Sequence, residues 1–333
     1  MAVYTSLSAA DLAALIAEYD VGALVSAKGI AEGVSNSNWL IETTGSDAGG
    51  GPKGSGDRFI LTMYEQRVDV ADLPFFLGLL DHLAARGSPV PRTIHDRAGA
   101  SFRMLGGKAV ALIEFLSGVS IDRPSPEQAC AVGAALAGLH RNAADFPGRR
   151  ANDMGLQRWH DLLAACGQDG LRSIDSALPD LVERELTFLT RHWPHGLPRS
   201  VIHADLFPDN VLLLGDEVRG LIDFYFACTD VTAYDLAVTH AAWCFGKDGA
   251  YRPDIGTALV AGYAAERPLS DAEWAALPVL ARGACMRFLA TRAFDWLHTP
   301  ADALVTRKDP LEFARRLAFY TAQGAQAFSR APD

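Results

Sequence analysis

The apolar residues in the first third of the chain change between helical and strand-like spacing. Between residues 12 and 19 they recur on one helix face, and Ser8 precedes Asp11 in an arrangement that resembles a capping box. A second helical pattern of Leu and Phe covers residues 69–86 and ends before a glycine. We therefore predict a helix in each of these two segments.

The segments between and after these helices have the pattern of short strands joined by turns. Residues 29–44 predict two strands around a turn of small residues, and the segment RFILTMYE predicts a third. The Gly-rich segment 45–57 lacks the G-x-x-x-x-G-K-[ST] order of a phosphate loop, and no helix follows it, which favours a hairpin tip. The segments SFRMLGG and KAVALIEFLSG complete the expected antiparallel sheet.

After residue 124 the pattern changes to long helices. The expected helices cover residues 125–141, 156–166, 176–193, 232–245, 254–265, 271–298 and 309–329. A small part with an antiparallel sheet and a helix therefore precedes a larger, mostly helical part, which predicts the α+β class. We place the boundaries at residues 1–113, 114–118 and 119–333.

Composition and charge limit the partners that the chain can have. Its 333 residues carry 40 acidic and 30 basic side chains, a net charge of −10, which argues against a nucleic-acid partner. The N-terminal segment lacks the basic start of a signal peptide, and no stretch reaches the ~20 apolar residues of a membrane span. The five cysteines are widely spaced without a C-x-x-C pair, as is typical of reduced thiols. We expect a cytoplasmic protein without a membrane partner.

The segment 199–226 is the strongest candidate for a catalytic site. It contains His203, Asp205 and Asn210 in the order H-x-D-x-x-x-x-N, followed by the strand VLLL, a turn and a second strand that ends at Asp223. The chain's own composition would produce this triplet by chance only ~0.01 times. A single Asp or Asn after a strand usually belongs to a turn, but these features together favour a catalytic segment.

This order of residues fits phosphoryl transfer, which needs an oriented hydroxyl and neutralised charge. Asp205 can accept the proton or the hydrogen bond of a substrate hydroxyl. Asn210 and Asp223 offer the amide and carboxylate oxygens that Mg²⁺ prefers. Protein kinases have the same order in the catalytic loop and its metal-binding Asp, with His203 in the first position of the H-R-D triplet. We therefore assign Asp205 and His203 to catalysis and Asn210 and Asp223 to the metal.

The segments HADLFPDN and LIDF resemble those of the aminoglycoside phosphotransferase and choline kinase superfamily. DLPFF, IDFYFAC and AWCFGKDGAY are similar to segments of the type II homoserine kinases, and the resemblance spans residues 20–310. It implies a bilobal, protein-kinase-like fold with a small nucleotide-binding N-terminal lobe, a hinge and a helical C-terminal lobe. It also implies that ATP and Mg²⁺ are used to phosphorylate the side-chain hydroxyl of L-homoserine in threonine biosynthesis.

The resemblance also implies roles for residues outside the motif. Asp235, in the next helix, corresponds to the Asp that braces the catalytic loop. The implied ATP-binding residues are Gly33, Ser35 and Asn36 in the turn over the phosphates and Glu114 and Leu116 in the hinge, whose backbone would bond the adenine.

The chain departs from the superfamily at two positions in the first lobe. The strand Lys that contacts the phosphates corresponds to Thr62, and the helix Glu that pairs with this Lys corresponds to Phe76. Loss of both is coherent, because one buried charge without its partner would be costly. Arg67, just after the strand, is a candidate substitute, although an exposed Arg at a strand end is equally consistent with the pattern.

The acceptor site is less clear from the sequence. An amino acid needs a cationic and an anionic partner, and an Arg fork suits its carboxylate. Arg292 and Asp295 are three residues apart, so an ion pair within the helix is the first expectation for them. The candidate substrate-binding residues are Tyr225, Asp230, Arg287, Arg292 and Asp295.

Three alternatives to this function remain open. The chain could phosphorylate another acceptor, such as choline, an aminosugar or an aminoglycoside. It could be a pseudokinase that binds nucleotide without turnover, which loss of the strand Lys would favour and retention of Asp205, Asn210 and Asp223 opposes. A protein kinase is disfavoured, because no A-P-E triplet follows Asp223.

Overall fold

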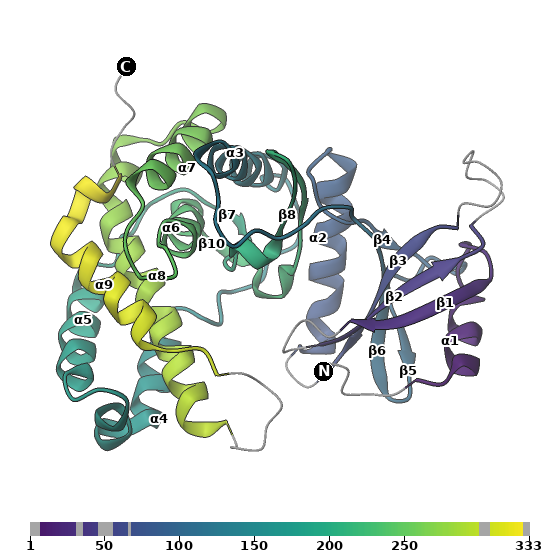
Figure 1. The fold of residues 1–333 in the computed structure, drawn as a ribbon, viewed down its shortest axis with the longest axis horizontal. Helices are drawn as coiled ribbons and strands as arrows, with labels where there is room; N and C mark the ends of the chain where they lie inside the picture. Colours follow the sequence, from purple (N-terminus) through teal and green to yellow (C-terminus); the bar gives the residue numbers. More distant parts are fainter. Residues whose placement is uncertain (1–6, 31–35, 46–55, 66–67, 300–306, 329–333) are drawn as a thin grey trace. The chain divides into compact units, whose positions relative to one another are not determined.

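The computed structural model describes residues 7–30, 36–45, 56–65, 68–299 and 307–328. The chain divides into two compact units, Met1–Ser117 and Gly118–Asp333 (Figure 1). The first contains an antiparallel sheet and the second is mostly helical, which confirms the predicted fold class. Within the described ranges, no helix has both the length and the apolar character required to cross a bilayer.

Unit 1 is an antiparallel sheet with helices on its faces (Figure 1). The strands run in the order β1-β2-β3-β6-β4, and β5 also pairs with β6. Its elements are α1 (Ala9–Ile16), β1 (Leu24–Ile30), β2 (Asn36–Thr43), β3 (Arg58–Tyr64), the 3₁₀ turn Val70–Asp72, α2 (Leu73–Ala85), β4 (Thr93–Ile94), β5 (Arg103–Leu105) and β6 (Lys108–Glu114). The helices and paired strands predicted from the pattern are present, although the first strand begins five residues earlier than residue 29. Most of the expected hairpin tip over residues 45–57 lies outside the described residues.

Helix α1 covers one face of this sheet. Ser8 and Asp11 form the predicted capping box, in which the Ser8 hydroxyl accepts from the Asp11 N–H. Ile16, Leu61 and Leu112 belong to one buried apolar cluster between the helix and the strands. Because side chains alternate along a strand, Thr62 faces away from this cluster. The sequence of unit 1 therefore builds its core mainly from apolar side chains.

Unit 2 contains seven long helices and two small antiparallel sheets among its described residues. Its elements are α3 (Pro126–Asn142), α4 (Leu156–Ile174), α5 (Leu178–His192), β7 (Arg199–Ile202), β8 (Val211–Leu214), β9 (Glu217–Leu221), β10 (Cys228–Val231), α6 (Thr232–Trp243), α7 (Pro253–Glu266), α8 (Asp271–His298) and α9 (Leu311–Gln323). Short 3₁₀ turns cover Pro208–Asn210, Phe224–Phe226 and Gly324–Phe328.

The predicted helices of unit 2 are confirmed. The helix expected over residues 156–166 ends at a kink, where Gly167 has a non-helical φ of 66°. A glycine adopts this conformation without the strain of a Cβ. A second helical stretch, which the pattern did not predict, follows the kink and continues to Ile174, so α4 contains two helical stretches.

Helix α6 forms the centre of unit 2 and follows β10 directly (Figure 1). All twelve of its residues are buried, as expected for a helix surrounded by other helices. Two of these neighbours, α3 and α7, approach each other through glycines: a Cβ on Gly133 would lie 2.0 Å from the Leu259 carbonyl oxygen. This close packing lets α3 carry His140 to the side chain of Tyr263 and to the N-terminal part of α6.

Candidate active site

The 203–210 loop lies between β7 and the β8–β9 hairpin. β7 pairs with β10, and β8 pairs with β9, so both arms of the predicted motif end close together. The Ile222 N–H donates to the Asn210 carbonyl oxygen at 3.0 Å, which joins the end of the loop to the residue before Asp223. The strand, turn and strand predicted after Asn210 are therefore confirmed, and they bring Asp223 next to the loop.

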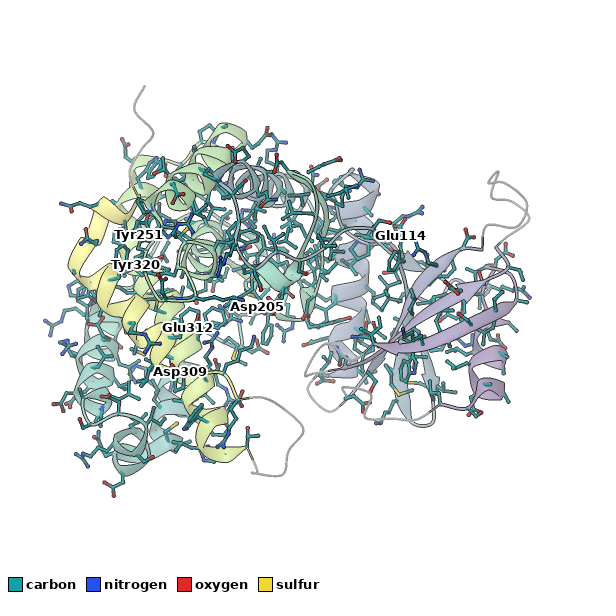
Figure 2. All side chains as sticks on the ribbon, in the orientation of Figure 1. Glu114, Asp205, Tyr251, Asp309, Glu312 and Tyr320 are labelled. Carbon is teal, nitrogen blue, oxygen red and sulfur yellow. The ribbon has the colours of Figure 1, made fainter. Side chains whose placement is uncertain are left out.

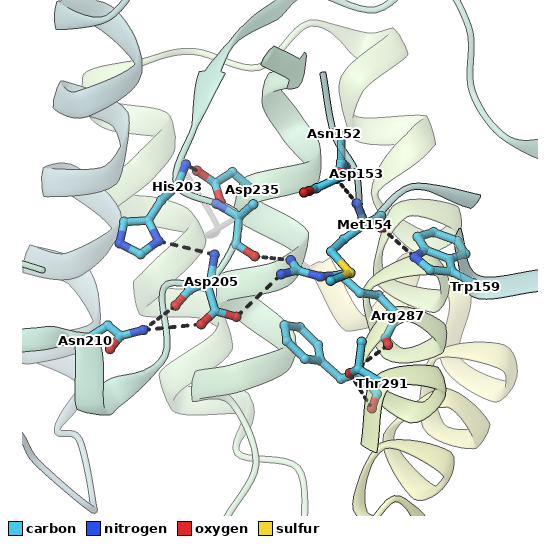
Figure 3. A network of polar contacts seen from close by, with 12 residues as sticks. Asn152, Asp153, Met154, Trp159, His203, Asp205, Asn210, Asp235, Arg287 and Thr291 are labelled. Atoms are coloured by element: carbon cyan, nitrogen blue, oxygen red, sulfur yellow. Dashed lines mark hydrogen bonds and ion pairs between the residues drawn. The ribbon is translucent and has the colours of Figure 1, made fainter. Parts of the chain in front are cut away.

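His203 is fully buried at the start of this loop. Its Nε2 donates to the Ile222 carbonyl oxygen at 2.9 Å, and its Nδ1 accepts from the Asp205 N–H at 3.2 Å (Figure 3). A carbonyl can only accept, so these contacts require a neutral imidazole with its proton on Nε2. Burial lowers the pKa of His203 in agreement with this form, and the ring links the loop to Ile222, the residue before Asp223.

Ala204 and Asp235 hold the loop in an unusual backbone conformation. Ala204 has a φ of 64°, the left-handed region that side chains other than glycine rarely adopt. The Asp235 carboxylate accepts from the His203 and Ala204 N–H groups, each at 2.7 Å. This confirms the prediction that Asp235, from α6, braces the loop. The two charge-assisted hydrogen bonds offset the strain of the left-handed residue.

Asp235 is itself fixed by a buried histidine that the sequence analysis did not single out. His140 of α3 contacts the Asp235 carboxylate through Nε2 at 2.9 Å and the Tyr263 hydroxyl through Nδ1 at 2.8 Å. Burial alone would raise the pKa of Asp235, but hydrogen bonds and charge from His140 and His203 hold it below its usual value. The carboxylate is therefore ionised and fully hydrogen-bonded.

Asp205 lies at the turn of the loop, with its side chain 18% exposed. The Asn210 amide donates to the Asp205 carbonyl oxygen at 2.8 Å, and its distance to the Asp205 carboxylate is 3.5 Å (Figure 3). Burial raises the pKa of Asp205, while the positive charge of Arg287 opposes this shift. The carboxylate is thus held in place and remains open to a ligand.

Arg287, which the sequence suggested for the substrate, lies beneath this loop. It is 2% exposed on α8. Its Nη1 donates to the Ala204 carbonyl oxygen and its Nη2 lies 3.7 Å from the Asp205 carboxylate (Figure 3). Arg287 therefore supports the loop from the side opposite Asp235.

Asp223 and Asn210 form the donor set that we predicted for a metal ion. Asp223 lies two residues after β9, which ends at Leu221, and it has a φ of 66°. Its pKa is raised to about 7, first by desolvation among the surrounding protein atoms and then by the negative charges of Asp205 and Asp209. A bound cation would relieve this repulsion, and one carboxylate with one amide oxygen is a set that suits a hard divalent ion. The residues present therefore fit Mg²⁺.

The predicted nucleotide-binding residues of unit 1 are only partly described. Gly33, Ser35 and Arg67 lie outside the described residues. Asn36 begins β2, and its side-chain oxygen accepts from the Glu65 N–H at 3.4 Å. Their assignment to ATP remains a prediction.

The predicted hinge follows β6. Glu114 ends this strand, and its carboxylate pairs with the Arg92 guanidinium at 3.1 Å. Its N–H already donates to the Arg92 carbonyl oxygen at 2.9 Å. A base would therefore use other backbone groups of the segment that contains the half-buried Leu116.

The two departures from the superfamily have neutral surroundings. Thr62 is buried on β3, and its hydroxyl donates to the Asn38 side-chain oxygen at 2.9 Å. Phe76 is 2% exposed on α2. Thr62 thus forms a hydrogen bond between neutral groups, and Phe76 belongs to the apolar core.

The candidate acceptor residues do not form one group. Asp230 on β10 accepts from the Asn152 amide at 2.7 Å and pairs with Arg199 at 3.1 Å, while Tyr225 lies in the turn after Asp223. The expectation of an ion pair between Arg292 and Asp295 was wrong. Arg292 instead pairs with Glu312 of α9 at 2.5 Å, because the packing of α8 against α9 turns its guanidinium toward that helix, and Asp295 is exposed.

Comparisons with known proteins agree with the motif. A model of the phosphotransferase enzyme family matches residues 26–269. The chain is 50% identical over 323 residues to a homoserine kinase of Xanthobacter autotrophicus, covering 97% of each chain. It is 49% identical over 334 residues to a homoserine kinase of Methylobacterium radiotolerans, covering 99% of each chain.

The fold is similar to solved structures of low sequence identity. An amicoumacin kinase in complex with AMP-PNP and Ca²⁺ has a TM-score of 0.69 and 13% identity, covering 96% of this chain and 94% of that chain. A spectinomycin phosphotransferase in complex with ADP and spectinomycin also has a TM-score of 0.69 and 13% identity, covering 97% of this chain and 100% of that chain.

Proposed function

The chain belongs to the phosphotransferase enzyme family and, within it, to the homoserine kinases, and from this premise we propose that Asp205 orients the side-chain hydroxyl of L-homoserine for attack on the γ-phosphoryl group of ATP. The product is O-phospho-L-homoserine, an intermediate of threonine biosynthesis. The observation that carries the assignment of residues is the arrangement of Asp205, Asn210 and Asp223 on one loop and the adjoining hairpin.

Asp205 acts on the acceptor. Its carboxylate accepts the hydrogen bond of the homoserine hydroxyl and takes its proton as the bond to phosphorus forms. The raised pKa of the buried Asp205 carboxyl improves it as a proton acceptor. The leaving group is ADP, so no covalent intermediate with the protein is required.

Asn210 and Asp223 hold the divalent cation. Mg²⁺ bound there supplies positive charge that neutralises the phosphate oxygens during transfer. Because the Asn210 amide nitrogen donates to the Asp205 carbonyl oxygen, its side-chain oxygen points away from that carbonyl group. This orientation leaves the oxygen free to serve as a ligand next to the Asp223 carboxylate.

His203, Asp235 and Arg287 are positioning residues in this proposal. His203 lies fully buried and bonds the backbone on both arms of the motif, which suits a structural link better than contact with a substrate. The Asp235 carboxylate accepts from the Ala204 N–H, and the Arg287 guanidinium donates to the Ala204 carbonyl oxygen. Together they set the direction of the Asp205 side chain.

We assign Gly33, Ser35 and Asn36 to the phosphates and the segment from Glu114 to Leu116 to the base, as the family resemblance implies. Arg67, which follows the strand that contains Thr62, is our candidate substitute for the superfamily's strand Lys. The five cysteines are unpaired, which supports a cytoplasmic location.

The test compares acceptors with purified protein, ATP and Mg²⁺, reading ADP release. L-Homoserine, L-threonine, L-serine, choline and a set of aminoglycosides are supplied separately. We expect turnover with L-homoserine that exceeds the others and is lost when the metal is chelated. Preference for another acceptor would leave the kinase assignment in place and reject homoserine, whereas nucleotide binding without any turnover would support a pseudokinase.

Asp205→Asn tests the catalytic assignment directly. Loss of a general base lowers kcat by roughly 10²–10⁴-fold, and we expect an effect in this range. Asp216→Asn, in the exposed β8–β9 turn, is the matched control and should keep kcat. An Asp205→Asn variant that is folded and keeps wild-type kcat would reject the proposed role.

A further inference from the structure

Unit 2 contains a cavity of about 270 Å³ beside the 203–210 loop. Phe207 and Asp209 of the loop contribute to its wall, as do residues at the C-terminal end of α6 and in the segment 120–124. Lys247 also lines the cavity and pairs with Asp122 of the segment 120–124 at 2.7 Å, so these two charges neutralise each other. Another part of the wall is formed by Arg292 of α8 with Glu312 and Arg316 of α9 (Glu312 and Asp205 are labelled in Figure 2). We call it the Arg292–Arg316 cavity.

The two arginines of this cavity share a single carboxylate. The Arg292 Nη1 pairs with one oxygen of Glu312 at 2.5 Å, and the Arg316 Nη2 pairs with the other oxygen. Arg316 also donates to the Ala241 carbonyl oxygen at 2.7 Å, and Arg292 donates to the Asp309 carbonyl oxygen at 3.1 Å. Carbonyl groups carry no net charge, so two guanidinium ions face one carboxylate and one positive charge remains in excess.

Arg316 is short of partners despite its burial. It is 5% exposed, and within the described part of the chain its Nε finds no hydrogen-bond acceptor. A buried donor without an acceptor is costly, and so is a buried cation without full neutralisation. Burial lowers the pKa of Arg316, and Glu312 opposes this shift. Arg316 thus lines the cavity with a charge that its protein partners satisfy only in part, which suits an anion in the cavity.

The cavity adjoins the loop that carries Asp205, because Phe207, two residues after Asp205, is part of its wall. The Lys308 ammonium lies 5.9 Å from the ring centre of Phe207. Its charge acts on both sites. Burial raises the pKa of Asp205, and Lys308 is among the cations that oppose this shift. Burial also opposes ionisation of Glu312, whose pKa is nevertheless lowered by Arg316, Arg292 and Lys308.

We propose that the Arg292–Arg316 cavity binds the α-carboxylate of the acceptor amino acid, with the Arg292 and Arg316 guanidinium groups as its partners. The inference rests on the proposed function, because it names the acceptor subsite of the same reaction. Guanidinium groups recognise planar carboxylates through paired N–H donors. Asp209, also in the wall, provides negative charge for the α-ammonium group. The acceptor's side chain then extends toward Asp205 on the same loop.

A simpler role for these residues is to tie α8 to α9. That role requires an ion pair between the helices but no preference for carboxylate ligands. The two roles therefore differ in one measurable property, which is the discrimination between L-homoserine and homoserinol, the analogue in which CH₂OH replaces the carboxylate.

The experiment measures binding of both compounds by calorimetry and kcat/KM for both, with wild type, Arg292→Met, Arg292→Lys and Arg316→Met. Arg141→Met is the matched control, because Arg141 forms an interhelical ion pair with Glu266 away from the cavity. We expect wild type to favour L-homoserine by ~100-fold or more, since a site built for a charged group rejects its neutral analogue. Each Arg→Met change should reduce this preference at least tenfold by raising KM, while Arg292→Lys retains part of it.

The possible outcomes separate this inference from the proposed function. Equal binding of the two compounds to wild type, or an unchanged preference in folded Arg292→Met, overturns the inference even if L-homoserine is phosphorylated. Preferential binding of L-homoserine that depends on Arg292 but leads to no phosphorylation supports the inference and rejects the proposed function. If Arg316→Met does not fold, the two Arg292 variants decide the result.

Discussion

The two regions to which the kinase resemblance assigns phosphate chemistry are built in opposite ways. In unit 1, the positions of the superfamily's ion pair hold Thr62, bonded to Asn38, and the core residue Phe76. In unit 2, the 203–210 loop is surrounded by buried charged groups, among them Asp235 and Arg287. At these two positions unit 1 has neutral contacts in place of the superfamily's charged pair, whereas the charged groups Asp235 and Arg287 of unit 2 are buried and bonded to the loop.

This difference shows how the chain manages the desolvation of charge. A buried ion that loses its partner destabilises the fold. The superfamily's Lys and Glu, at the positions of Thr62 and Phe76, can therefore be replaced together more easily than one at a time. Around the 203–210 loop, the carboxylates of Asp205 and Asp235 are retained. Their desolvation is instead offset by N–H donors and nearby cations.

Substitution of Asp235, which braces the loop, should have the largest effect on stability and activity. Asp235→Asn places an amide donor against the His203 or Ala204 N–H, so the loop loses a charge-assisted bond in a buried site. We expect the free energy of unfolding to fall by about 3 kcal/mol and kcat to fall roughly 10- to 100-fold. Denaturant unfolding and steady-state rates measure these effects. Asp254→Asn, an exposed residue in an ion pair with Arg252, should change neither by much, and an equal loss there would remove the distinction.

Arg287 tests the other side of the same loop. Arg287→Met removes the donor to the Ala204 carbonyl oxygen and the cation near Asp205. We expect kcat to fall roughly tenfold while KM for ATP changes little, because positioning of Asp205 is lost. Arg287→Lys should recover part of kcat, since an ammonium can still donate to the carbonyl. A rise in KM for ATP alone would indicate that Arg287 contacts the nucleotide.

The two units also differ in the burial of their histidines. His140, His203 and His240 of unit 2 are buried, whereas His82 and His95 of unit 1 are not. Burial lowers the pKa of His240 to about 3, and its Nδ1 lies 2.6 Å from the Tyr320 hydroxyl. Below pH ~6.5 the imidazole of His240 is protonated in the unfolded chain, whereas in the folded chain it stays neutral down to pH ~3. The contribution of the neutral His240 to the free energy of unfolding is therefore complete above pH ~6.5 and decreases as the pH falls.

This linkage predicts acid sensitivity of unit 2. From pH 7 to pH 5, His240 alone should reduce the free energy of unfolding by about 2 kcal/mol. His240→Gln, which cannot titrate, should show a shallower decline in urea unfolding measured across this range. His298→Gln, an exposed change on α8, serves as the control. Identical pH slopes for wild type and His240→Gln would show that this buried histidine does not contribute.

The smallest effect is expected at Thr62. Thr62→Val removes the hydroxyl that donates to Asn38 and keeps the shape of the side chain. We expect a loss of about 1 kcal/mol in the free energy of unfolding, with kcat and KM for ATP within about threefold of wild type because the residue carries no charge for the phosphates. A tenfold rise in KM for ATP would mean that Thr62 takes part in nucleotide binding and would break the contrast between the two regions.

The sequence alone determined the elements of the fold and the linear motif. Helix positions followed from apolar spacing and from caps such as Ser8, and the order of His203, Asp205, Asn210 and Asp223 identified the family and the chemistry. These features depend on residues close together in the chain, so spacing is sufficient to find them. Asp235 could also be predicted, because the resemblance supplied its position.

Only the tertiary structure decided which distant side chains support the site. Arg287 reaches the loop from a helix 83 residues away in the sequence, and His140 reaches Asp235, which braces the loop, from 95 residues away. Arg292 turns to Glu312 rather than to Asp295 three residues along its own helix. Spacing lists the partners that a side chain could have within one helix. The packing of α3, α8 and α9 in unit 2 determines which partner it reaches, because a buried charge takes the arrangement that leaves the fewest groups without a partner.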